Sequence, residues 1–288
     1  MSQGSLFCFG YGYSADALAK TLDKKKWNIH GTKRESLVSK DNNSNIISFN
    51  GYNPIPNAKN ILMDMSHLLI SIPPSPEGDP VIALHRSDIA NSTNLKWIGY
   101  LSTTGVYGNS GGAIVDEKYL CKPTNARSRR RLKAEKDWLK LFYDFGLPIH
   151  IFRLAGIYGP GRSAIDSVLN GRAKRISVPG HKFSRIHVCD IARVLAASIK
   201  KPNPGRIYNV CDNESASGAD VTLYACELLG VSPPPLINLK DAQLSTMARS
   251  FYSDNRRVDN QRIKKELSFD FKYPTYREGL KSIYKALV

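Results

Sequence analysis

Two glycines near the N-terminus form the clearest pattern that could bind a charged ligand. Residues 10–15 read GYGYSA. They follow an apolar segment, Leu6–Gly10, and precede a run with helical spacing, Ala15–Leu22. The order of strand, glycine turn and helix is typical of a βαβ unit that binds a dinucleotide. The sequence therefore predicts a phosphate site here, and the alternative is a strand–turn–helix that binds nothing.

Each position of this turn has an expected task. Gly10 permits the tight bend, Gly12 leaves room for a pyrophosphate against the backbone, and Ala15 lets the helix pack close to the strand. The N–H groups at the start of the helix, near Tyr13 and Ser14, would then face the anion. We expect all five residues to belong to a cofactor site.

Two cations follow the second predicted strand, Trp27–Thr32. An NAD-binding protein usually places Asp or Glu on the ribose hydroxyls, about 20 residues beyond the glycines. In this chain Thr32 is followed by Lys33 and Arg34. Cationic side chains suit a 2′-phosphate better than a ribose hydroxyl, because a guanidinium matches phosphate oxygens. We expect Thr32, Lys33 and Arg34 to contact the cofactor. The pattern favours NADP over NAD, and a basic surface turn is the alternative.

Further candidates follow the fourth and fifth predicted strands, His67–Ile72 and Trp97–Ser102. Ligands of a doubly wound sheet bind beyond the carboxyl ends of its strands. Hydroxyl side chains at such ends could bind a ligand oxygen, or could instead form the turn itself. We expect cofactor contacts from Ser71, Ile72, Pro73 and Ser102 and a substrate contact from Thr104, while Thr103 and Tyr107 are candidates for the reaction itself.

Alternating strands and helices must position these residues. Apolar segments at Ile46–Phe49 and Ile149–Leu154 complete six predicted strands in the first 155 residues, and helical patterns cover Val81–Ala90 and Asn125–Phe145. Such alternation predicts an α/β fold with a doubly wound parallel sheet of Rossmann type. After Leu154 the pattern becomes irregular. We expect the dinucleotide-binding domain to comprise 1–155 and 187–211, and a smaller, mainly helical C-terminal substrate lobe to comprise 156–186 and 212–288.

The later elements are predicted from shorter patterns. A strand at Ile186–Val188 precedes a helix at Ile191–Ile199, for which Asp190 is the expected N-cap. The other predicted elements are a strand at Arg206–Val210 and helices at Asp220–Leu229, Ala242–Met247, Asn255–Leu267 and Tyr276–Leu287.

Composition excludes several classes of protein. No apolar run approaches the roughly 20 residues that span a bilayer. The five cysteines are an odd number without paired spacing and predict reduced thiols in a cytoplasmic protein. The six histidines lack metal-ligand spacing, so no metal site is expected. The net charge of +16 attracts anions, but it comes without a nucleic-acid-binding motif, so we expect no specific nucleic-acid partner.

Five motifs in one order resemble the extended short-chain dehydrogenase/reductases, the NAD(P)-dependent nucleotide-sugar epimerase and dehydratase family. They are the glycine turn, STTGVYG at 102–108, RLAGIYGPGR at 153–162, RIHVCDIA at 185–192 and YNVCD at 208–212. The likeness covers nearly the whole chain. It implies that Thr103 is the catalytic Ser/Thr and that Leu154 and Ala155 lie beside the nicotinamide. It also places Tyr158 at the substrate site, with a structural role as the alternative, and suggests a possible homodimer through the Val81–Ala90 and Asn125–Phe145 helices. Arg162 and Arg185 could bind a substrate diphosphate, because guanidinium groups match phosphate oxygens.

One departure from the family pattern affects the chemistry. The family's base is a Tyr four residues before a Lys, but alignment on Ala134 and Glu135 places Arg127 and Arg131 at those positions. A guanidinium stays protonated at working pH and cannot act as that base. This loss is similar to the atypical, YeeZ-like branch of the family. Tyr107 could replace the missing phenol, although packing is the alternative role.

Helical spacing gives the two arginines a second interpretation. Arg131 lies seven residues before Trp138 and four after Arg127, which places both near the buried stripe of their helix. In one interpretation Arg131 binds cofactor ribose or phosphate and Arg127 binds an anionic substrate group. In the other, both side chains extend to water from an exposed first turn. We expect an NADP-dependent oxidoreductase or epimerase with an anionic small-molecule substrate, or else a non-catalytic NADP-binding sensor.

Overall fold

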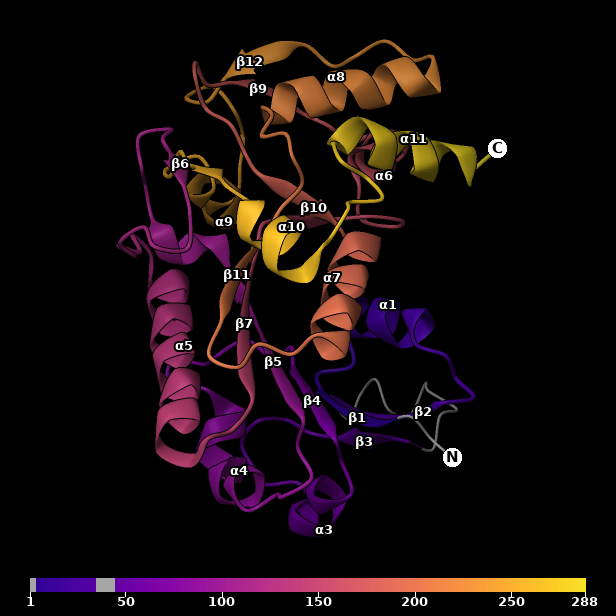
Figure 1. Ribbon diagram of the computed structural model, residues 1–288. Helices are drawn as coiled ribbons and strands as arrows, with labels where there is room; N and C mark the ends of the chain where they lie inside the picture. The colour runs from indigo at the N-terminus through magenta and orange to yellow at the C-terminus, as the bar shows by residue number, and fades with distance from the viewer. Residues whose placement is uncertain (1–3, 35–44) are drawn as a thin grey trace. The chain divides into compact units, whose positions relative to one another are not determined.

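The computed structural model describes residues 4–34 and 45–288, and its largest sheet in these ranges has seven strands (Figure 1). Its strand order is β11 (Ile207–Val210), β7 (Ile149–Leu154), β5 (Trp97–Thr103), β4 (His67–Ile70), β1 (Gly4–Phe9), β2 (Trp27–Lys33) and β3 (Ile46–Ser48). The pairings from β3 through β2, β1 and β4 to β5 are parallel. This is the order of a doubly wound dinucleotide-binding sheet, so the predicted Rossmann fold is confirmed.

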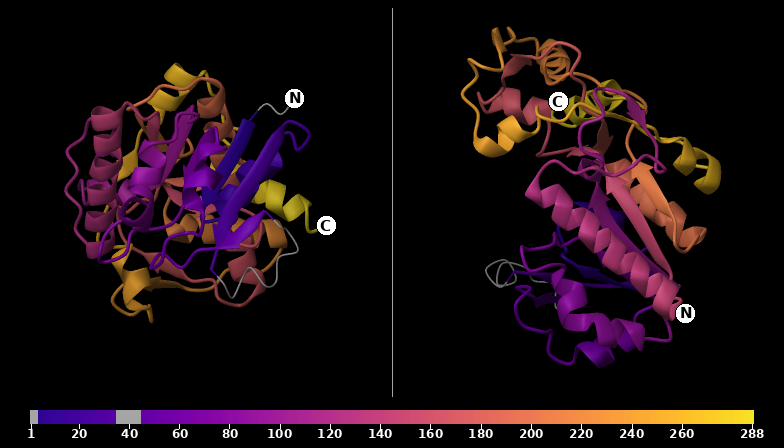
Figure 2. Two further views of the ribbon diagram at one scale, coloured as in Figure 1. Left: turned by 90° about the horizontal axis from the view of Figure 1, so that it is seen from below. Right: turned by 90° about the vertical axis from the view of Figure 1, so that its left-hand side faces the viewer.

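Helices cover both faces of this sheet. On one face, Phe9 and Ile98 share a core cluster with Trp138 of α5 (Ala126–Phe145). The same cluster draws on α3 (Ala58–Met63) and α4 (Pro80–Ala90). Neighbouring residues of a strand point to opposite faces, so Trp97 faces away from the cluster that contains Ile98. On that other face, Trp97 donates its indole N–H to Ser198 Oγ of α7 (Val188–Lys200) at 3.0 Å. Figure 2 shows α5 running across the strands that it covers.

The chain divides into two compact units. The first comprises Met1–Thr103, Ala126–Arg153 and Ile191–Tyr208. The second comprises Thr104–Asn125, Leu154–Asp190 and Asn209–Val288. The sequence pattern places 104–125 in the dinucleotide-binding domain, whereas in the structure this segment lies in the second unit. The reason is a parallel pairing of β6 (Ile114–Val115) with β13 (Arg257–Val258).

The second unit has its own core. Ile165, Val221 and Leu280 belong to one buried cluster, which joins α6 (Ala164–Leu169), α8 (Gly218–Leu229) and α11 (Tyr276–Lys285). Two strand pairs accompany it: β10 (Arg185–His187) with β8 (Gly156–Tyr158), and β12 (Leu236–Asn238) with β9 (Arg175–Ser177). The sequence predicts helices here and misses most of these strands, because two or three residues are too few for a detectable alternation.

Three predictions of local structure are wrong. Asp190 lies inside the first turn of α7, and its carboxylate accepts from the N–H groups of Lys272 and Tyr273, each at 2.9 Å. The helix predicted over Asn255–Leu267 begins only at Gln261 in α10 (Gln261–Leu267), since β13 occupies part of the range. The helix predicted at Ala242–Met247 is displaced to α9 (Thr246–Ser250), where the Ser245 side chain caps it.

Candidate functional site

The glycine turn joins β1 to α1 (Tyr13–Thr21) in the first unit. Gly10 has a φ of +90°, a conformation that favours glycine. A Cβ at Gly10 would also lie 2.9 Å from Cγ1 of Ile72. Gly12 differs, because its φ of −107° suits any residue and a Cβ there would meet no atom within 4 Å. Gly12 therefore borders open space next to the start of a helix, which is the room that a pyrophosphate would need.

Thr32 fixes the shape of this turn. Its side chain is buried, and its Oγ1 accepts a hydrogen bond from the N–H of Gly10 at 2.9 Å. Its carbonyl oxygen accepts from the N–H of Tyr11 at 2.7 Å. These two bonds attach the turn to β2. The structure thus gives Thr32 a supporting role in addition to the cofactor contact that its position in the sequence suggests.

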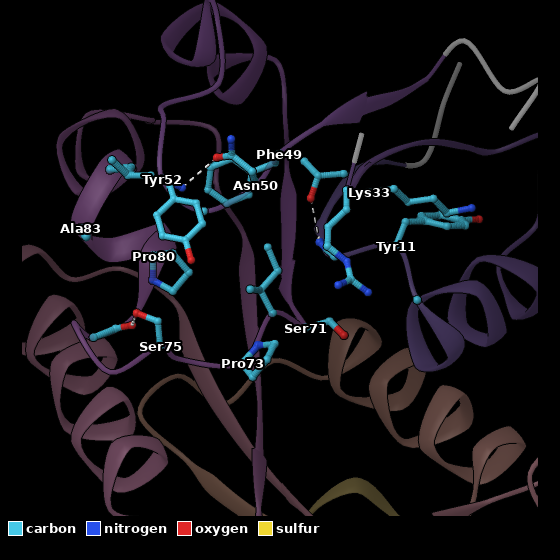
Figure 3. A pocket seen from close by; sticks show the side chains of 18 of the residues that line it. Tyr11, Lys33, Phe49, Asn50, Tyr52, Ser71, Pro73, Ser75, Pro80 and Ala83 are labelled. Carbon is cyan, nitrogen blue, oxygen red and sulfur yellow. Dashed lines mark hydrogen bonds between the residues drawn. The ribbon is translucent and has the colours of Figure 1, made fainter. Parts of the chain in front are cut away.

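A pocket of about 720 Å³ opens beside the turn, entirely within the first unit (Figure 3). Of the expected cofactor residues, those that line it are Gly10, Gly12, Thr32, Lys33, Arg34, Ser71, Ile72 and Pro73. Sequence reasoning missed the remaining wall, which is formed by Tyr11, Phe49, Asn50, Gly51, Tyr52, Ser75, Glu77, Gly78, Pro80, Ala83 and Leu84. Most of these follow β3 or β4, so the rule about carboxyl ends of strands could have indicated them.

Charge of both signs borders the pocket. Lys33 is half-buried and its Nζ lies 5.6 Å from the centre of the Tyr11 ring, whereas Arg34 is exposed. Glu77 is exposed as well, and the pKa of its carboxyl is lowered chiefly by the hydrogen bond that Ser75 Oγ donates to it at 2.7 Å. The two cations lie on the side of β2, and the carboxylate lies in the loop after β4.

A buried ion pair is hydrogen-bonded to the C-terminal end of β5. Glu135 of α5 accepts from Arg153 of β7, with an Nη2–Oε2 distance of 2.7 Å, and both side chains are almost wholly buried. Ser102 Oγ donates to the same carboxylate at 2.5 Å. Ser102 is expected to contact the cofactor, but its hydroxyl proton is donated inside the protein. Ser102 instead fixes the strand directly before Thr103, which is itself half-buried.

The structure separates the roles of the two arginines on α5. Arg131 is half-buried and its Nη1 donates to the carbonyl oxygen of Leu101 at 2.8 Å and to the Tyr100 hydroxyl at 3.2 Å. In the structure Arg131 therefore holds β5, and its contact with a cofactor stays a prediction. Arg127 lies exposed in the first turn of α5.

Three residues expected near substrate are committed to packing in the second unit. Tyr107 is fully buried and its hydroxyl donates to Asn209 Oδ1 at 2.7 Å. Tyr158 is buried, and burial raises the pKa of its phenol. Arg185 donates to the carbonyl oxygens of Phe183 and Ala216 at 2.9 and 2.8 Å, and burial lowers its pKa. These contacts give the three side chains a structural role, and the catalytic role of Tyr107 and the substrate contacts of Tyr158 and Arg185 stay predictions.

The other predicted residues are placed as follows. Tyr13, Ser14 and Ala15 begin α1, and the latter two are buried. Thr104 is buried in a short 3₁₀ helix, Thr104–Tyr107, and Arg162 is exposed. In the second unit, Leu154 ends β7 and the buried Ala155 follows it.

Metal-ligating clusters and helices that could span a membrane are both absent from residues 4–34 and 45–288. No three His, Cys, Asp or Glu side chains gather there in a group that could hold a metal ion. Nor does any helix in these ranges combine the length and apolar character needed to cross a bilayer.

Comparison with known proteins identifies relatives of this chain. Residues 81–211 match the model of the NAD dependent epimerase/dehydratase family. Protein YeeZ of Escherichia coli K12 is 28% identical over 221 residues, which cover 74% of this chain and 73% of YeeZ.

Solved structures extend the likeness over the whole chain. A functionally unknown conserved protein from Silicibacter pomeroyi is 45% identical, with a TM-score of 0.88 and 99% of each chain covered. The UDP-glucuronic acid 4-epimerase of Bacillus cereus, solved with UDP-glucuronic acid and NAD, shares only the fold. It is 17% identical, with a TM-score of 0.76 over 99% of this chain and 100% of the epimerase.

Proposed function

Because residues 81–211 match the model of the NAD dependent epimerase/dehydratase family, we propose that this chain binds NADP in the pocket of the first unit. We further propose that it acts as an oxidoreductase or epimerase on a nucleotide-sugar-like substrate. The observation that carries the proposal is the shared pocket of Gly12, Lys33 and Arg34. It supplies room for a pyrophosphate and two cations for an additional phosphate.

Different residues of the chain would contact the reacting oxygen, bind the substrate and hold the strand that carries the site. A bound nicotinamide would supply the hydride acceptor or donor. Thr103, at the end of β5, would donate a hydrogen bond to the reacting substrate oxygen and so stabilise charge that develops there. The exposed Arg127 and Arg162 would bind anionic groups of the substrate. Arg131 and Glu135 would hold the strand that carries Thr103.

The nucleotide preference is tested by binding. The wild-type protein is expected to bind NADPH more tightly than NADH, and Lys33→Ala with Arg34→Ala should weaken NADPH binding at least about tenfold, since hydrogen bonds to charged groups contribute ~1.5–3 kcal/mol. NADH binding should change little. Lys140→Ala, an exposed charge on α5 outside the pocket, is the matched control. Tighter binding of NADH by the wild type would contradict the assignment.

The chemical step is tested at Thr103. Thr103→Val removes the hydroxyl at nearly constant volume and should reduce hydride transfer with a responsive nucleotide sugar by about 100-fold, the typical loss when one such donor is removed. NADPH affinity should stay unchanged, which separates a chemical defect from a binding defect. The measurement is single-turnover absorbance of NADPH. Unchanged transfer in this variant would exclude the role of Thr103.

A non-catalytic NADP-binding sensor is the second candidate. The observation in its favour is that arginines occupy both positions of the family's Tyr and Lys, and guanidinium groups stay protonated at working pH and cannot act as the base. The two candidates differ in one result. Tight NADPH binding without hydride exchange on any nucleotide sugar would support the sensor, and turnover of a single one would support the enzyme.

A further inference from the structure

Tyr11 is the one residue within the glycine turn to which the sequence assigns no task, and its position is unusually well fixed. Its N–H donates to the carbonyl oxygen of Thr32 at 2.7 Å. Its ring packs against Gly31 so closely that a Cβ there would lie 2.9 Å from Cδ2 of the ring. The backbone hydrogen bond to Thr32 and the packing of the ring on Gly31 therefore both hold Tyr11 against β2.

The fixed ring supports the Lys33 side chain. Lys33 Nζ lies 5.6 Å from the ring centre, within the range of a cation–π contact. Figure 3 shows Lys33 extended along the Tyr11 ring, and both side chains line the pocket. A lysine side chain has many rotamers, and ordering it on ligand binding costs conformational entropy. The ring restricts those rotamers before any ligand arrives.

We infer that Tyr11 is a specificity-determining residue that positions Lys33 for the additional phosphate of NADP. The inference rests on the proposed function of the same pocket. Arg34 is exposed and Lys33 is half-buried, so the ring acts on the cation that lies deeper in the protein. Tyr11 would act through Lys33 and need not contact the phosphate. Its loss should therefore weaken the binding of NADPH but not of NADH, whereas loss of a general packing residue would weaken both.

The test is a double-mutant cycle on the ratio of NADH to NADPH dissociation constants, measured by calorimetry with the full chain. Tyr11→Leu should lower the wild-type preference for NADPH about threefold, the scale of a partly exposed cation–π contact, and leave NADH affinity unchanged. Tyr11→Phe keeps the ring and should keep the preference. In a Lys33→Ala background, Tyr11→Leu should have no further effect on the ratio.

The outcomes distinguish the inference from the function on which it rests. An unchanged ratio in Tyr11→Leu overturns the inference, as does an equal loss for both nucleotides, which would indicate a packing role. The same threefold loss in the Lys33→Ala background would also overturn it. A wild-type protein that shows no preference for NADPH would instead overturn the proposed nucleotide assignment, and the role of Tyr11 with it.

Discussion

Gly12→Val is expected to abolish NADPH binding while the protein stays folded. A valine at residue 12 meets no protein atom at its Cβ, and the local φ of −107° is open to it. Its side chain would occupy the space beside the start of α1 that a pyrophosphate needs. We expect the affinity for NADPH to fall at least about 100-fold, equivalent to about 2.8 kcal/mol, in a fluorescence titration. The free energy of unfolding should change by less than about 0.5 kcal/mol.

Gly10→Val is the matched control, because the same substitution two residues earlier should damage the fold itself. The φ of +90° at Gly10 is strained for valine, and the new side chain would collide with Ile72. The expected destabilisation is about 2 kcal/mol or more, measured by urea unfolding. Normal NADPH binding by Gly12→Val would exclude a dinucleotide at this turn, whatever the result for Gly10→Val.

The second large effect is expected at Glu135. Glu135→Gln keeps the volume of the side chain but leaves the buried guanidinium of Arg153 without a compensating charge. Breaking one partner of a buried ion pair costs about 3–5 kcal/mol, and Ser102 loses its charged acceptor in addition. We expect a loss of this size in the free energy of unfolding, determined by urea denaturation followed by far-UV circular dichroism.

Two variants make this result specific to the buried pair. Asp137→Ala removes the partner of Lys133 on the same helix, where Lys133 is exposed and Asp137 is half-buried, and should cost less than about 1 kcal/mol. Adding Arg153→Met to Glu135→Gln removes the unpaired charge and should restore much of the lost stability. A cost at Glu135 no larger than that at Asp137 would show that the buried pair contributes nothing to the fold.

The main sheet could be predicted because its signals are local. The predicted strand Ile149–Leu154 coincides with β7, and the predicted helix Val81–Ala90 differs from α4 by one residue. Each is a long run of residues with a single periodicity, bounded by turn or capping residues. The strands of the second unit could not be predicted in this way. Arg257–Val258, for example, is a strand only because Ile114–Val115 lies beside it.

The candidate site could likewise be predicted only in part from the sequence. The glycines and the cations at 33 and 34 follow directly from residue type and spacing. The role of Tyr11 depends on the Gly31 that it packs against, and the role of Glu135 depends on Arg153, 18 residues away. For Tyr107 the sequence suggests a catalytic hydroxyl, whereas in the fold this hydroxyl donates a hydrogen bond to Asn209.

The sequence by itself indicated where a phosphate could be bound, because a tight turn favours glycine, and helix N–H groups and cationic side chains attract an anion wherever the chain folds. Only the tertiary structure decided which polar side chains are engaged within the protein. Ser102, Arg131 and Arg185 could each have faced a ligand, but groups distant in the sequence accept their hydrogen bonds. The physical reason is that a buried donor must find a partner, and packing between distant segments determines which one it finds.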